Sequence, residues 1–228
     1  MKTAVSTDYR RFLSPVVLLT ALMIWTGCAP VIQSNFKIRY RGESLPLFFE
    51  PGARIVVFPL LTTEQQTFNP GMTSAAIEAQ LRLDQRHLPI IPFESLQNAV
   101  MDKGIQDVFL SACNDFYRNG QVAGKDLKAL RESIAPLRPK FFLFLRIERM
   151  QAYRDASRTH KRQIFLSGSL FAVEGETEAL RFTCATLGEG RSHPVPLKDL
   201  VADNVRILIR SLPSDLSRSM ELEKEKEW

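Results

Sequence analysis

The sequence predicts an α/β protein with α+β character: a mixed β-sheet of about five strands with helices packed on it. Two observations support this class. In the first half of the domain, short apolar runs alternate with segments of helical period, and in the second half longer apolar runs follow one another directly. Alternation favours parallel strands and consecutive runs favour antiparallel pairing, so we expect both kinds in one sheet.

The first predicted elements are strands. Phe36, Ile38 and Tyr40 alternate with basic residues, which is the period of a half-buried edge strand. Residues 54–58 form a nearly continuous β-branched and aromatic run that ends at a proline, as is typical of a buried strand. Residues 87–91 supply a further strand.

Helices are predicted between and after these strands. Residues 73–83 begin with Thr and Ser and carry apolar residues four apart. Ser95 is the expected cap of a second helix, with Gly104 as its stop. Asp126 opens a third helix with an apolar stripe at helical spacing, whereas residues 105–124 fit neither period clearly.

The C-terminal half has the period of strands. Residues 140–147 are too apolar for anything but a central strand, and residues 163–173 and 179–187 give two more, joined by a hairpin turn at 174–177. We expect these strands to be antiparallel. A last amphipathic helix follows over residues 197–212.

The N-terminus has the features of an export signal. Basic residues precede an apolar run at residues 12–25, about 14 residues, which is shorter than the ~20 that a helix needs to cross a bilayer. The sequence Thr26-Gly27-Cys28 follows and resembles the lipobox of bacterial lipoproteins, which implies acylation of Cys28. Ordinary cleavage after Ala29 and an uncleaved anchor are the alternatives.

This resemblance implies a location and a division of the chain. A neutral residue after the cysteine, here Ala29, implies the outer membrane in such families, with the domain facing the periplasm; the outer leaflet of the inner membrane and the cell surface are alternatives. The acyl chains would bind the lipid bilayer firmly, at about 0.8 kcal/mol per buried methylene. The expected segments are a signal peptide (1–27), a lipidated N-terminus and tether (28–51), a periplasmic α/β domain (52–213) and a charged tail (214–228).

Composition excludes some classes of function. Hydrophobic residues make up 45% of the chain and charged ones 24%, which are ordinary values for a globular protein. The formal net charge is +5, part of it from the leader, and this is too weak to argue for nucleic acid. An oxidising periplasm permits a disulfide between Cys113 and Cys184, and the alternative is two buried free thiols.

The sequence offers little chemistry, so we expect no catalytic residues, no metal site and no cofactor. His87, His160 and His193 lie far apart and in no zinc-binding spacing. Ser167 lacks the Gly-x-Ser-x-Gly elbow and falls within a predicted strand, where a polar strand face is expected. The segment 188–190 is too short to cradle a phosphate and is interpreted as a turn.

A basic segment falls in the expected connection between two strands. Such a loop can hold anionic glycan, phospholipid headgroups or an acidic partner by screened Coulomb attraction. The alternative is a solvated hairpin tip kept soluble by its charge. The cations are Arg149, Arg154, Arg158, His160, Lys161 and Arg162.

The element order also resembles a known group. The first buried strand, residues 54–60 (RIVVFPL), followed by a polar loop, a helix, a second strand and another helix, is similar to the TolB amino-terminal and CsgG lipoprotein group over about residues 52–213. The resemblance implies a non-enzymatic binding or assembly module of the envelope, with an envelope protein or peptidoglycan as partner. The long amphipathic strands of the curli pore are missing, so a channel is not expected.

A lipid-tethered periplasmic hydrolase or ligand-processing enzyme is the alternative function. Convergent polar side chains in one deep pocket would favour the enzyme. A featureless cleft with an exposed sheet edge or apolar patch would favour the binding module.

Overall fold

One mixed sheet of seven strands organises the protein. The computed structural model describes residues 30–50, 52–62, 89–208 and 210–211. The hydrogen-bonded order is β1-β7-β6-β5-β2-β4, with β3 also against β5. The strands are β1 (Val31–Arg41), β2 (Ile55–Val57), β3 (Leu61–Thr62), β4 (Ile90–Ile91), β5 (Phe141–Arg154), β6 (His160–Ala172) and β7 (Thr177–Gly190). The predicted mixed sheet is confirmed, with more strands than the expected five, and β3 was not predicted.

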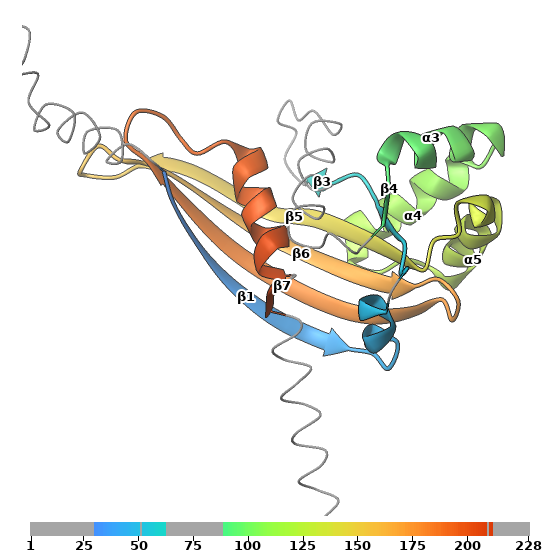
Figure 1. The fold of residues 1–228 in the computed structure, drawn as a ribbon. Coiled ribbons are helices and arrows are strands. Elements are labelled where there is room, and N and C mark those ends of the chain that lie inside the picture. Colours follow the sequence, from blue (N-terminus) through green and yellow to red (C-terminus); the bar gives the residue numbers. More distant parts are fainter. Residues whose placement is uncertain (1–29, 51, 63–88, 209, 212–228) are drawn as a thin grey trace, which may run out of the picture.

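The antiparallel part consists of β1, β7, β6 and β5, which run the length of the molecule (Figure 1). The β5–β6 ladder extends from the pair Phe141 and Ala172 to the pair Arg154 and His160. At the end with Arg154 and His160, both strands extend beyond their predicted bounds. The ladder is made by backbone groups, so it continues after the apolar side chains have stopped.

The parallel part is short and buried. β2 lies between β4 and β5 and is parallel to both, with Ile55 opposite Ile90 on one side and Phe141 on the other. All three residues of β2 are buried, which agrees with the nearly continuous apolar run in the sequence.

Three helices, α3 (Phe93–Asp102), α4 (Gln106–Asn119) and α5 (Gly124–Ser133), follow β4. The predicted cap at Ser95 is wrong, because α3 begins two residues earlier, after Pro92, and Ser95 lies in its first turn. Gly104 does follow α3 and has φ +63°. The segment 105–124, left without an assignment, is largely α4, which ends at Gly120 in the left-handed conformation.

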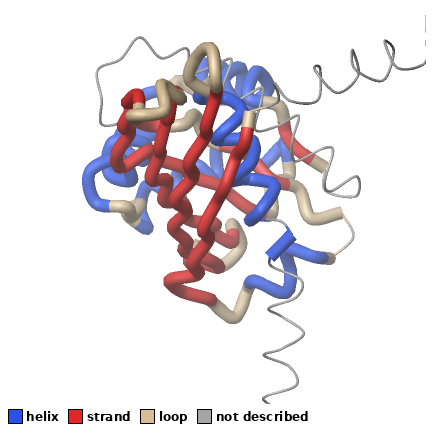
Figure 2. The backbone as a smooth tube through the Cα atoms, turned by 90° about the vertical axis from the view of Figure 1, so that its left-hand side faces the viewer, coloured by secondary structure: helices blue, strands red, loops and turns tan. Residues whose placement is uncertain are grey.

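The sheet has a different helical layer on each face. Residues 197–208 form the C-terminal helix, and its predicted apolar stripe packs with Leu143, Ile164 and Phe182 on what we call the C-terminal-helix face. The opposite three-helix face buries Phe142, Phe144 and the apolar sides of α3, α4 and α5. Figure 2 shows the strands as one layer with helices beside it.

The domain begins before the expected boundary at residue 52. β1 pairs with β7 from Val31 to Arg41, so the expected tether contributes a full edge strand. The short 3-10 helix η2 (Leu45–Phe49) then buries Leu45 and Phe48 in the core of the C-terminal-helix face. The alternating pattern at Phe36, Ile38 and Tyr40 is therefore confirmed as an edge strand that belongs to the sheet.

The expected turn at 188–190 is wrong, because β7 continues through Gly190. These glycines serve close packing. A Cβ on Gly188 would lie 2.6 Å from Leu200 and 2.8 Å from the Cβ of Val195, so a side chain there would push the C-terminal helix away.

Several predictions lie outside the described residues: the signal peptide, Cys28, the helix at 73–83, His87 and the tail at 214–228. Within the described ranges, none of the helices combines the length and the apolarity needed to span a membrane.

Candidate functional site

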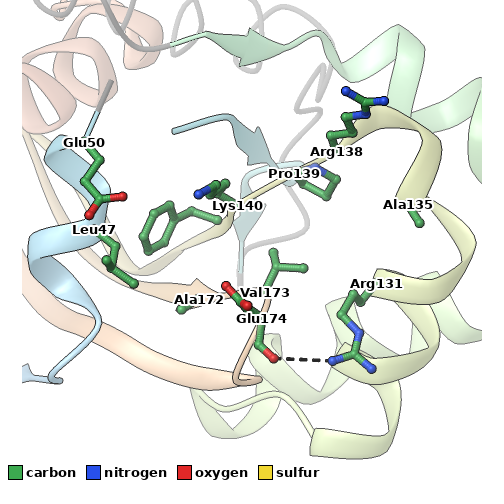
Figure 3. Close-up of a pocket in the computed structure, with 11 residues that line it drawn as sticks. Leu47, Glu50, Arg131, Ala135, Arg138, Pro139, Lys140, Ala172, Val173 and Glu174 are labelled. Atoms are coloured by element: carbon green, nitrogen blue, oxygen red, sulfur yellow. Dashed lines mark hydrogen bonds between the residues drawn. The ribbon is translucent and has the colours of Figure 1, made fainter. Parts of the chain in front are cut away.

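A pocket lies at the end of the sheet where β5 begins and β6 ends (Figure 3). It encloses about 550 Å³. Its lining comes from η2, from α5 and the turn after it, and from the strand ends. The residues are Leu47, Glu50, Arg131, Ala135, Arg138, Pro139, Lys140, Phe141, Ala172, Val173 and Glu174. We call this the strand-end pocket.

Local structure explains the shape of the strand-end pocket. Phe48 of η2 packs edge-on against Phe141 with ring centroids 5.4 Å apart, which fixes one wall beside the strand ends. On the other side, the short 3-10 helix η3 (Ala135–Leu137) follows α5, and Arg138 turns the chain with φ +51° before β5 starts.

The basic side chains of the strand-end pocket differ in their contacts. Arg131 is held by Glu176 at 2.9 Å and by the backbone oxygen of Glu174 at 3.4 Å. Arg138 and Lys140 are exposed at the rim. The lining is otherwise mainly apolar and contains no hydroxyl, thiol or imidazole. Glu50 and Glu174 add carboxylates to the lining. Such a pocket suits a ligand with an apolar body and a charged group, and its lining holds no hydroxyl or thiol nucleophile paired with an imidazole base.

The predicted basic loop is mostly strand. Arg149 and Arg154 lie in β5, and His160, Lys161 and Arg162 lie in β6, so the connection is only residues 155–159 and carries Arg158. The prediction of a long loop is wrong because the ladder runs almost to the turn.

The tight turn has its own hydrogen bonds. Ser157 donates to Asp155 at 2.6 Å, and the backbone N–H of Thr159 donates to the same carboxylate at 3.0 Å. These bonds, with the nearby Lys161, lower the pKa of Asp155 below its usual value. Lys161 lies 2.9 Å from Glu189 and 3.3 Å from Asp155, and its pKa is raised, chiefly by the hydrogen bond to Glu189.

The basic residues do not converge on one point. Arg162 points into the C-terminal-helix face, where its guanidinium donates to the backbone oxygen of Val195 at 2.8 Å. Arg149 lies opposite Phe165 in the ladder, several residues from the turn. Arg154 and Arg158 are exposed at the turn itself, where Arg154 donates to the backbone oxygen of Arg158.

Arg146 is an important residue that the sequence did not single out. It donates to the backbone oxygens of Phe116 at 3.2 Å and Tyr117 at 2.8 Å, near the end of α4, and to Ser167 at 3.0 Å. A cation at a helix C-terminus is favourable and satisfies carbonyls that lack helical partners. Arg146 therefore fastens α4 to the sheet, and Ser167 is one of its supports, in accord with the expected polar strand face.

A buried polar network links the C-terminal helix to β1 and β7. Ser34 donates to Asp203 at 2.7 Å and lies 2.6 Å from the hydroxyl of Thr186. Thr186 donates to Asn204 at 2.9 Å, and Asn204 donates to the backbone oxygen of Leu200 at 2.8 Å. The hydroxyls have carboxylate and amide partners but no imidazole, so the network fixes packing and is not a hydrolytic triad.

Cys113 and Cys184 are free and buried. Cys113 packs in the three-helix core, whereas Cys184 points toward the C-terminal helix, next to Thr186 at 3.8 Å. The sheet separates the two thiols, so this fold holds no bridge between them. Burial raises the pKa of Cys113 to about 12 and also raises that of Cys184.

The two described histidines stay apart. His160 opens β6, and His193 lies in the exposed segment after β7, where its Nδ1 is 3.0 Å from the hydroxyl of Ser192. In the described part of the chain, no group of His, Cys, Asp and Glu side chains is arranged to hold a metal ion.

Two further surfaces have the character of binding sites. β1 is an edge strand of 11 residues, and among the described strands it has a neighbour, β7, on one side only. Exposed Met101 and Leu110 flank an apolar depression of about 210 Å³ between α3 and α4. An edge strand and an apolar patch are common sites of protein association.

Neither a protein-family model nor a curated protein matches the sequence. Among solved structures, the PelC dodecamer from Paraburkholderia phytofirmans aligns with a TM-score of 0.45 and 8% identity, over 76% of this chain and 94% of that one. Lipoprotein GNA1162 from Neisseria meningitidis gives 0.39 and 14%, over 71% and 99%. The LpoB C-terminal domain from Salmonella enterica gives 0.39 and 10%, over 59% and 82%. All three TM-scores are below 0.5, so these likenesses carry no conclusion about function.

Proposed function

We propose that this protein is a membrane-anchored envelope lipoprotein that acts as a non-enzymatic binding or assembly module. The single observation that carries the proposal is the leader, residues 1–27, which ends in Thr26-Gly27 directly before Cys28, with β1 starting three residues later at Val31. A short apolar leader followed by a cysteine supports export and acylation, and the bilayer becomes the first partner through Cys28.

Binding is supported by the surfaces of the domain. The strand-end pocket has an apolar lining with exposed cations at its rim, and an apolar patch lies on α3 and α4. Within the described ranges, the outer edge of β1 has no paired strand. These features match the ones expected for a binding module. The resemblance to the TolB amino-terminal and CsgG lipoprotein group points the same way, and an envelope protein or peptidoglycan is the proposed partner.

The outer membrane, with the domain facing the periplasm, is the proposed location, because Ala29 is neutral. The hydrolase alternative has no specific observation in its favour. The strand-end pocket supplies cations and carboxylates only, without a hydroxyl, thiol or imidazole that could act as nucleophile with an adjacent base.

The proposal is tested by the chemistry of Cys28 in cells. Labelled palmitate should enter the wild-type protein, and mass spectrometry should find a mature chain that begins at acylated Cys28 and fractionates with the outer membrane. Cys28→Ser should abolish labelling and keep the leader attached, whereas Cys113→Ser, the matched control, should label normally. An intact Met1 with an unmodified sulfur at Cys28 would contradict the proposal.

A further inference from the structure

The end of the sheet where β1 begins (Figure 1) lies opposite to the strand ends that line the pocket, and exposed arginines lie at or next to several strand ends there. Arg154 ends β5, Arg158 lies in the turn that follows, and Arg191 comes directly after β7. The register brings their strand ends together: His160 is opposite Arg154 on one side and Gly190 on the other.

The acidic side chains nearby do not neutralise these arginines. Asp155 and Glu189 both pair with Lys161. Arg154, Arg158 and Arg191 have no carboxylate partner among the residues that the structure describes. The end of the sheet therefore presents three guanidinium groups to solvent, in a form suited to phosphate.

The same end exposes an apolar residue and an aromatic one. One row across the sheet runs from Val31 to Glu189, then to Lys161 and to Tyr153. Val31 is 52% exposed and Tyr153 is 48% exposed. A tyrosine with an apolar body and a polar tip suits the boundary between headgroups and acyl chains.

Covalent geometry fixes how far this end can lie from the lipid. Val31 is three residue steps after Cys28, which allows at most about 10 Å even in an extended chain. Acyl chains on Cys28 would thus keep the start of β1 within about one Debye length of the headgroups, and the strand ends that carry the arginines lie beside it at the same end of the sheet.

We propose that this arginine-bearing end, defined by Val31, Tyr153, Arg154, Arg158 and Arg191, docks on anionic phospholipid headgroups of the leaflet that holds the acyl chains. The inference rests on the proposed acylation of Cys28. It sets an orientation as well: β5 has 14 residues, so the strand-end pocket is carried on the order of 45 Å from the membrane.

The test uses the acylated full-length mature protein in vesicles of phosphatidylcholine, alone or with one quarter phosphatidylglycerol. A fluorophore on Ala156→Cys, in the exposed turn, reports proximity to lipids spin-labelled at the headgroup, and one on Thr177→Cys reports the opposite end. Cys113 and Cys184 are buried and stay unlabelled in the native state. We expect strong quenching at 156 on the anionic vesicles, weaker quenching on neutral ones, and none at 177.

Charge variants separate this contact from simple tethering. R154Q/R158Q/R191Q should reduce the ratio of docked to undocked domains on anionic vesicles by about fivefold for each arginine. R118Q/K125Q/K128Q, which removes three exposed cations from α4 and α5, should leave quenching at 156 unchanged. Raising the salt concentration should reduce the difference in quenching at position 156 between anionic and neutral vesicles.

The outcomes are distinguishable. An unmodified sulfur at Cys28 contradicts the proposed function and this inference together. An acylated protein whose probe at 156 stays unquenched, or is quenched equally after R154Q/R158Q/R191Q, contradicts this inference alone. Arginine-dependent retention on isolated peptidoglycan without any on anionic vesicles would also overturn it, in favour of a glycan partner.

Discussion

The two faces of the sheet are held by different chemistry. On the three-helix face, Phe144 stacks on Phe58 with centroids 3.9 Å apart and contacts Phe116 and Phe171 at 5.3 and 5.8 Å. On the C-terminal-helix face, apolar packing is supplemented by the buried network of Ser34, Thr186, Asp203 and Asn204. Apolar contact tolerates small shifts, whereas a buried hydrogen-bond network requires one position of the helix.

The largest effect is expected from the aromatic cluster. Phe144→Ala should lower the free energy of unfolding by about 3–5 kcal/mol, since it removes a fully buried ring and leaves a cavity among three others. Tyr153→Ala, on the exposed part of the same strand, is the control and should change stability by less than about 1 kcal/mol. Urea unfolding followed by circular dichroism measures both. Equal losses would mean that the cluster is not a centre of stability.

The attachment of α4 comes next. Arg146→Met keeps most of the unbranched apolar stem but removes the donors to Phe116 and Tyr117, so we expect a loss of about 2–3 kcal/mol. Arg146→Lys, which keeps the charge but not the fork, should be intermediate. Hydrogen exchange should show the loss concentrated in α4. Uniform exchange across the sheet would contradict the role of Arg146 as the fastening of this helix.

In the network on the C-terminal-helix face, the effects of substituting Thr186 and Asn204 should depend on each other. Asn204→Leu leaves the buried Thr186 hydroxyl without one of its acceptors and should cost about 1–3 kcal/mol. Thr186→Val/Asn204→Leu should recover part of that loss, because both partners become apolar. Lys198→Leu, at an exposed position of the same helix, should be nearly neutral. If the double variant loses more free energy of unfolding than the two single variants together, the hydrogen bond between Thr186 and Asn204 does not have this role.

The smallest effect is a dependence on pH. Burial raises the pKa of the Cys113 thiol from 9.0 to about 12 in the folded protein, so its contribution to stability is complete below pH 9 and is lost as the pH rises toward 12. At most about 1.4 kcal/mol is lost per pH unit in that window. Comparing the wild type with Cys113→Ala by urea unfolding at pH 8.5 and 10.5 isolates this group. Parallel pH dependence of the two would contradict it.

The comparison of the faces also explains what the sequence could predict. Runs such as residues 54–58 and 140–147 have a composition that only a buried strand tolerates, so the central strands were predicted well. The network could not be predicted, because in the sequence Ser34 and Asn204 look like ordinary polar residues. The fold brings their strand and helix together from opposite ends of the chain. The role of Arg146 was not predicted for the same reason, because its acceptors belong to a helix about 30 residues earlier in the sequence.

The predicted lengths of strands β5, β6 and β7 were wrong for a related reason. The basic residues after Ile147 suggested a loop, but the backbone ladder between β5 and β6 does not depend on apolar side chains. The segment 188–190 suggested a turn because glycine is common there, whereas these glycines make room for the chain that leads into the C-terminal helix. The strand-end pocket was not predicted, since its walls come from three separate parts of the sequence.

The place of β1 at the sheet edge has a mechanical consequence. A pull on the chain just before Val31, directed along the strand, loads the hydrogen bonds to β7 in shear, because they run perpendicular to the strand. Bonds loaded in shear must rupture nearly together, whereas a pull across the edge would open them one by one like a zipper. Single-molecule stretching in the two directions should therefore give a high single force peak for the first and a low plateau for the second, so that an anchored domain would resist drag best along its own long axis.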